Sequence, residues 1–152
     1  MKYFVYYSLT GNGDVLADFM KENGYTIIKL ETKKDIGKIN FFKMISLGGK
    51  ALFHKEMELK PYELELKDDD DLVIGSPVWN DRVACPMNTF FNHLKFDESR
   101  AKVILYSGGG KAKHAFEYLN RDLSYPRILI LKEPKKHLEE VKPFIQTSII
   151  VK

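Results

Sequence analysis

The stretch YYSLTGNGD, residues 6–14, joins a run typical of a β-strand (residues 3–7) to the segment VLADFMKE, whose apolar residues have helical spacing. Hydroxyl residues, two glycines and an asparagine fill the junction. A strand that turns directly into a helix leaves unpaired backbone N–H groups at the positive end of the helix dipole. Such a junction is suited to binding a phosphate group.

The side chains of this loop favour the same interpretation. Ser8, Thr10 and Asn12 can add hydrogen-bond donors, while Gly11 and Gly13 let the backbone approach a ligand closely. No lysine or arginine lies in the loop, so a monophosphate is a better match than a triphosphate. The P-loop spacing G-x-x-x-x-G-K-[ST] is also absent, which argues against a nucleoside triphosphatase. Taken alone, the loop could equally be a turn followed by a helix N-cap.

Composition limits the class of protein. The chain has 152 residues, 44% of them hydrophobic and 30% charged, which predicts one soluble globular domain over residues 1–152. The single cysteine, Cys85, cannot form an intrachain disulfide and is interpreted as structural. No signal peptide or membrane-spanning stretch is recognisable, so a cytoplasmic location is expected. The net charge of +3 comes from bases interleaved with acids, which favours neither a nucleic-acid nor a membrane partner.

Strand-like and helix-like segments alternate along the chain, and alternation of this kind produces a parallel sheet covered on both faces. The sequence therefore predicts an α/β fold, a doubly wound five-stranded parallel sheet of order 2-1-3-4-5 with helices on both faces. The expected strands are residues 3–7, 25–31, 72–75, 102–107 and 127–131, with TSIIVK at the C-terminus as a further edge strand. The expected helices are 14–23, 39–54, 85–94, a segment with Ala112, Ala115, Phe116 and Leu119 on one face, and 134–142, before Pro143.

Three unusual loops follow strands that meet in this topology. A ligand of such a sheet lies outside the carboxyl ends of the strands, where the strand order reverses between strands 1 and 3. The loop after strand 3 is SPVWND, from Ser76 to Asp81, and it contains the only tryptophan, Trp79. The loop after strand 4 is the glycine-rich SGGGK, residues 107–111. All three loops are expected at one edge of the sheet.

These motifs resemble the flavodoxin family. Ser-Leu-Thr-Gly-Asn-Gly resembles the flavodoxin phosphate loop T/S-x-T-G-N-T, and GSPVWND resembles the family's second flavin loop, in which an aromatic ring covers the isoalloxazine. The resemblance extends from Met1 to about Leu131 and is strongest to small bacterial flavodoxin-like proteins. It implies flavin mononucleotide (FMN) as the cofactor. The residues implied as its ligands are Ser8, Leu9, Thr10, Gly11, Asn12 and Gly13 for the phosphate, and Pro77, Val78, Trp79, Asn80, Asp81, Ser107, Gly108, Gly109 and Gly110 for the ring.

The chain departs from the flavodoxin pattern in three respects. Gly13 stands where a threonine or serine is usual, the loop after strand 4 has no aromatic residue, and the chain is not strongly acidic. A flavodoxin-type electron carrier is the favoured function. An NAD(P)H-dependent flavin or quinone reductase and a flavodoxin-like binding module without flavin remain alternatives.

The redox chemistry would belong to the flavin, so no catalytic acid or base is assigned. The four histidines lack metal-ligand spacing, His114 is expected to face solvent, and the acidic run 68–71 is interpreted as a solvated loop, so no metal site is predicted. The expected partner is a redox protein or a nicotinamide donor. The sequence leaves a monomer and a homodimer equally open.

Overall fold

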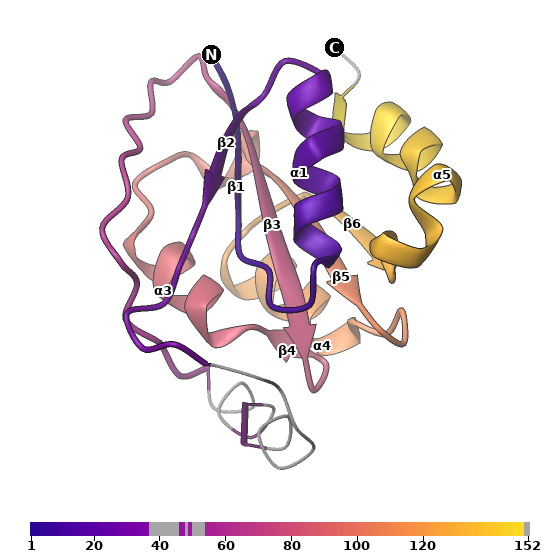
Figure 1. The fold of residues 1–152 in the computed structure, drawn as a ribbon. Coiled ribbons are helices and arrows are strands. Elements are labelled where there is room, and N and C mark those ends of the chain that lie inside the picture. Colours follow the sequence, from indigo (N-terminus) through magenta and orange to yellow (C-terminus); the bar gives the residue numbers. More distant parts are fainter. Residues whose placement is uncertain (37–45, 48, 50–53, 151–152) are drawn as a thin grey trace.

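The sheet of the computed structural model, which describes residues 1–36, 46, 47, 49 and 54–150, is built around the central strand β3 (Figure 1). Five parallel strands lie in the order β2-β1-β3-β5-β6, and the short strand β4 pairs antiparallel with β3. The strands are β1 (Lys2–Tyr6), β2 (Thr26–Lys29), β3 (Asp71–Trp79), β4 (Arg82–Val83), β5 (Lys102–Ser107) and β6 (Arg127–Lys132). The predicted α/β class with a mostly parallel sheet is confirmed, while the predicted order differs through the unexpected β4.

Strand β3 is longer than predicted. The segment Ser76 to Trp79 was expected to be a loop, but it continues the strand because β5 pairs with it on one side and β4 on the other. Strands β3 and β4 form a hairpin in which Trp79 faces Arg82. The two turn residues between them, Asn80 and Asp81, have φ of 49° and 59°. Left-handed conformations at both positions are typical of a type I′ turn, whose twist matches that of the paired strands.

The helices are α1 (Asn12–Glu22), α3 (Cys85–His93), α4 (Lys113–Glu117) with a π-helical turn (Tyr118–Asp122), and α5 (Pro134–Ile145) with a second π-helical turn (Gln146–Ile150), besides a 3₁₀ turn (Glu98–Arg100). Helices α1 and α3 begin and end within two residues of the predicted bounds, whereas α5 is longer than predicted. No helix among the described residues is long and apolar enough to cross a membrane.

The structure differs from the predictions at the C-terminus and at Phe116, and one predicted helix lies mostly outside the described residues. Helix α5 continues past Pro143, and residues 147–150 are helical, so the predicted C-terminal edge strand is wrong there. Phe116 is 37% exposed, although it was expected on the buried face of its helix. The helix predicted over 39–54 falls almost wholly outside the described residues.

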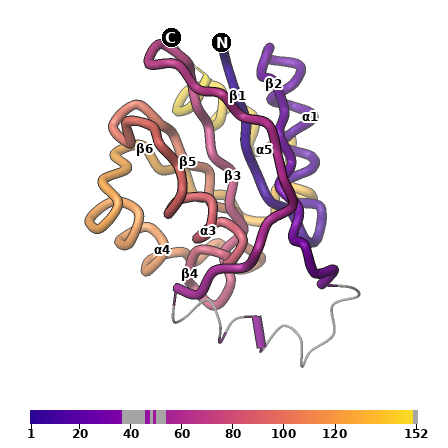
Figure 2. The backbone as a smooth tube through the Cα atoms, turned by 90° about the vertical axis from the view of Figure 1, so that its left-hand side faces the viewer, coloured from indigo at the N-terminus to yellow at the C-terminus, as the bar shows by residue number. Residues whose placement is uncertain are grey.

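Each face of the sheet has its own hydrophobic core. Helices α1 and α5 cover one face, where they pack on alternate strand residues such as Phe4, Val73 and Ile104. Helices α3 and α4 cover the other face, and their core contains the intervening strand residues. The extended connection 54–70 passes along that second face and adds leucines to its core (Figure 2). Side chains of successive strand residues point to opposite faces, which explains the continuous apolar runs in the sequence.

An ion pair between the buried Lys102 and the partly exposed Asp71 lies at the amino ends of β3 and β5. The Lys102 ammonium is 2.9 Å from the Asp71 carboxylate and donates to the Ile149 carbonyl at 2.8 Å, while Tyr25 donates to the same carboxylate. The neighbouring Asp70 is only 5% exposed and accepts the Lys67 N–H. The prediction that residues 68–71 form a solvated loop is therefore wrong for these two carboxylates. No group of three or more metal-ligating side chains occurs among the described residues.

Removing the Lys102 charge should destabilise the fold. In Lys102→Met, the partly exposed Asp71 carboxylate loses its cation and keeps its tyrosine partner, so the free energy of unfolding in urea should fall by about 2 kcal/mol. The control is Lys60→Met, whose ion pair with Glu31 is exposed on both sides and should matter little. Equal urea midpoints for the two variants would contradict a structural role for the pair of Lys102 with Asp71.

Candidate functional site

The loop between β1 and α1 forms a tight turn that Ser8 holds from within. Gly11 caps α1 with a φ of 95°, a left-handed conformation that glycine adopts readily. The Ser8 hydroxyl oxygen accepts the N–H of Gly11 at 3.2 Å and that of Gly13 at 3.1 Å. These two amides were expected to face a phosphate. In this structure they bind Ser8, so a phosphate would reach them only by displacing that hydroxyl.

Two tyrosines explain why residue 13 is a glycine. A methyl group placed on Gly13 would lie 2.6 Å from the Tyr106 hydroxyl oxygen and 2.7 Å from Tyr6 Cδ2. Tyr106 is fully buried, and its hydroxyl donates to the Tyr7 carbonyl at the end of β1. Burial raises the pKa of Tyr106 well above its usual value, which keeps this donor protonated. The departure from the flavodoxin signature at this position therefore follows from packing.

The first turn of α1 carries a negative charge that is already paired. The Asp14 carboxylate accepts the Tyr6 hydroxyl at 2.8 Å and the Lys29 ammonium at 2.7 Å. Burial raises the pKa of Asp14, but these hydrogen bonds and the lysine charge outweigh it and lower the pKa below its usual value. Lys29 therefore offsets the charge nearest to the loop.

The hairpin β3–β4 places Trp79 beside the end of β1. The Trp79 ring meets the Tyr7 ring edge to face, with centroids 6.1 Å apart and an interplanar angle of 82°. Tyr7 is almost fully buried, and burial raises its pKa to about 12. Trp79 itself is half-buried, Val78 likewise, and Pro77 is buried beneath them. The predicted ring-covering residue thus stands at the carboxyl edge next to the phosphate loop's strand.

The hairpin turn is fastened to α4. Asn80 is exposed, whereas the Asp81 carboxylate lies 2.6 Å from His114 Nδ1 and accepts the His114 N–H at 3.3 Å. The Asp81 carbonyl accepts the N–H of Ala115. The carboxylate and the carbonyl of Asp81 therefore both contact α4. The half-exposed His114 has a partner that the sequence did not indicate.

The loop after β5 is open to solvent. Gly108 and Gly109 are exposed, and a methyl group added to either would meet nothing within 4 Å. Gly110 has a φ of 69° and lies against the Lys132 side chain. The Ser107 hydroxyl is buried and has no hydrogen-bond partner among the described residues, although the Ser107 carbonyl accepts the Glu133 N–H. A buried hydroxyl without a partner at a strand end is the kind of group that a ligand satisfies.

Lys135, at the start of α5, also reaches this edge. Its backbone N–H donates to the Asn12 side-chain oxygen at 3.0 Å, and its ammonium lies 3.4 Å from the Thr10 carbonyl. The sequence contains no local indication of a role for Lys135 at the site, because it follows the loop by more than a hundred positions. The signal was available, since Lys135 stands just after a parallel strand that ends at the same edge.

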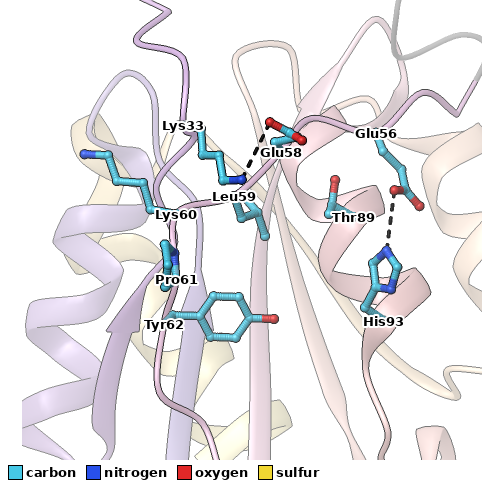
Figure 3. Close-up of a pocket in the computed structure, with 9 residues that line it drawn as sticks. All are labelled: Lys33, Glu56, Glu58, Leu59, Lys60, Pro61, Tyr62, Thr89 and His93. Atoms are coloured by element: carbon cyan, nitrogen blue, oxygen red, sulfur yellow. Dashed lines mark ion pairs between the residues drawn. The ribbon is translucent and has the colours of Figure 1, made fainter.

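A groove of about 580 Å³ lies elsewhere, between the connection 54–70 and α3 (Figure 3). Its charged side chains face one another in pairs, Glu56 with His93 at 3.6 Å and Lys33 with Glu58 at 3.8 Å. None of the fifteen ligand residues predicted from the sequence lines this groove. The edge formed by the three loops is therefore the candidate site.

Three solved structures have a similar fold. A flavoprotein from Lactobacillus acidophilus NCFM, solved in complex with FMN, aligns with a TM-score of 0.60 at 15% identity and covers 91% of this chain and 96% of its own. A protein from Bacteroides uniformis ATCC 8492, provisionally described as a flavoprotein, aligns with a TM-score of 0.72 at 20% identity over 95% and 97% of the two chains.

A protein from Bacteroides eggerthii DSM 20697 with the same description aligns with a TM-score of 0.68 at 17% identity over 99% and 98%. The fold is flavodoxin-like. No protein-family model and no curated protein matches the sequence. At these identities the likeness concerns the fold alone.

Replacing Gly13 in this flavodoxin-like fold should be costly. Gly13→Ala forces the added methyl group against Tyr6 and Tyr106, and we expect the free energy of unfolding to fall by roughly 2 kcal/mol in urea. The control is Gly109→Ala, which has free space around it and should stay within about 0.5 kcal/mol of the unsubstituted protein. A Gly13→Ala variant as stable as this control would show that the tyrosines give way.

Proposed function

We propose that this protein binds FMN at the edge formed by its three loops and acts in electron transfer. The observation that carries the proposal is the convergence of a phosphate-type loop, a half-buried tryptophan and a buried hydroxyl without a partner at the carboxyl ends of β1, β3 and β5. Ligands of open α/β sheets lie at this edge, where the strand order reverses. The FMN complex of the Lactobacillus protein, which shares the fold, supports the choice of cofactor.

The residues present fit such a ligand. The phosphate would lie at the start of α1, where the helix dipole favours an anion. It would displace the Ser8 hydroxyl from the N–H groups of Gly11 and Gly13. Trp79 would cover one face of the ring, a large apolar contact. The Ser107 hydroxyl, which has no partner among the described residues, would meet a polar atom of the ring, and the free space around Gly108 and Gly109 would let the ring approach their backbone.

The ion pairs around the site help to distinguish an electron carrier from a reductase. When bound, FMN supplies the redox chemistry, and the protein supplies binding, orientation and electrostatics. Side-chain carboxylates near the loops are taken up by internal contacts, Asp14 with Lys29 and Asp81 with His114. These two carboxylates are therefore not left free to act as the acid or base of a proton transfer. This favours a carrier that exchanges electrons with a redox partner protein over a reductase that uses a nicotinamide donor.

FMN should bind more tightly than riboflavin, because only FMN has the phosphate that the loop after β1 would hold. The two ligands share the ring, so the difference in affinity isolates the phosphate. Titration with quenching of flavin fluorescence measures both dissociation constants. We expect at least a tenfold difference, which corresponds to about 1.4 kcal/mol, and equal constants would remove the phosphate assignment.

The carrier and the reductase differ in their response to a nicotinamide donor. Under anaerobic conditions, the absorbance of the bound flavin should persist when NADH or NADPH is added alone, and should bleach only when a separate flavin reductase is also present. Rapid bleaching by NADPH or NADH alone, followed by turnover with a quinone, would establish the reductase instead.

A further inference from the structure

Lys135 is attached to the phosphate-type loop by its own backbone. It is the second residue of α5, and its N–H donates to the Asn12 side-chain oxygen at 3.0 Å. This bond ties the start of α5 to the start of α1, and the two helices pack together on the same face of the sheet. The position of the lysine therefore does not depend on its flexible side chain alone.

The Lys135 side chain lies over the turn of the loop. A methyl group placed on Gly11 would be 3.3 Å from both the Cδ and the Nζ atom of Lys135, so the ammonium rests where a side chain at position 11 would stand. The ammonium lies 3.4 Å from the Thr10 carbonyl oxygen. That distance is long for a hydrogen bond between nitrogen and oxygen, so the contact is weak. An ammonium has three donors, and this contact engages one of them.

The acidic residues at the start of α1 and around position 135 in the sequence pair with other groups. Asp14 pairs with Lys29, Glu133 with Lys136 at 2.7 Å, and Glu140 with His137 at 3.2 Å. Among the ion pairs of the described residues, none contains Lys135. The Lys135 ammonium thus contacts a carbonyl of the loop and no carboxylate of the described residues. An anion that binds the ammonium would have to replace only this weak contact.

We propose that Lys135 is a direct ligand of the flavin phosphate and the residue that selects phosphorylated flavin over riboflavin. This inference rests on the proposed function. The loop itself offers only neutral donors, and a hydrogen bond between an ammonium and a phosphate oxygen is about twice as strong as a neutral one. Lys135 thereby supplies to the phosphate site the charge that the sequence of the loop lacks.

The test compares two neighbouring lysines. Lys135→Met keeps most of the aliphatic stem and the backbone N–H that binds Asn12, while it removes the charge. Lys136→Met removes the same charge one residue away, from an ammonium that is paired with Glu133 on a side chain 68% exposed. Dissociation constants for FMN and riboflavin are measured for each variant and for the unsubstituted protein at low and high salt.

Lys135→Met should weaken FMN binding roughly ten- to a hundredfold and leave riboflavin binding unchanged. Lys136→Met should change either constant by less than about threefold, the scale of a screened surface charge. Lys135→Arg should keep most of the preference for FMN, because it keeps the cation. The salt dependence of FMN binding should also be smaller in Lys135→Met than in Lys136→Met.

The outcomes separate the inference from the proposed function. If the unsubstituted protein prefers FMN and the two methionine variants behave alike, Lys135 is not a phosphate ligand while the FMN site stands. If the unsubstituted protein binds neither flavin, both proposals fail together. Urea midpoints establish that each variant is folded, and Lys135→Gln replaces the methionine variant if the latter has lost stability. An unchanged FMN affinity in a folded Lys135→Gln protein overturns the inference equally.

Discussion

Tyr106 fixes the geometry on which the candidate site depends. It belongs to β5, yet its hydroxyl reaches the Tyr7 carbonyl at the end of β1 and lies against Gly13 at the start of α1. The loop between β1 and α1 is therefore held by a residue of β5, although β3 lies between β1 and β5 in the sheet. Because Tyr106 is fully buried and its pKa is raised, this contact is made by a neutral donor. A residue larger than glycine at position 13 would therefore disturb the core between α1 and the sheet.

The sequence predicted whatever repeats locally and missed what depends on contacts across the chain. The apolar run of β5 was placed correctly at both ends, and α1 within two residues, because their patterns are continuous. The extension of β3 to Trp79 was missed, since Pro77 and the polar residues around it resemble a loop until β4 is available as a partner. The C-terminal segment was predicted as a strand from its isoleucines, whereas Ile149 is buried against the sheet within a helical turn.

For the candidate site, the motifs indicated the right edge of the sheet but not how its atoms are engaged. Asn80 has a positive φ, which asparagine tolerates better than most residues, while the contact of Asp81 with His114 depends on a hairpin that the sequence did not predict. Tyr106 and Lys135 were missed for the same reason, because each acts on a loop that is distant in sequence. Gly13 was noted as a missing hydroxyl, and only the packed tyrosines explain why it is a glycine.

The pairing partners of the central strand β3 indicate the order in which parts of the sheet form. Residue 2 pairs with residue 71 between β1 and β3, whereas residue 73 pairs with residue 102 between β3 and β5. The first pairing closes more than twice the length of chain, and each doubling of a loop costs about 0.6 kcal/mol of closure entropy. Contacts that are near in sequence form sooner when stabilities are similar. The pairing of β3 with β5 should therefore precede the pairing of β3 with β1. The loop after β1 and the hairpin after β3, which form two sides of the candidate site, are brought together only at that later step.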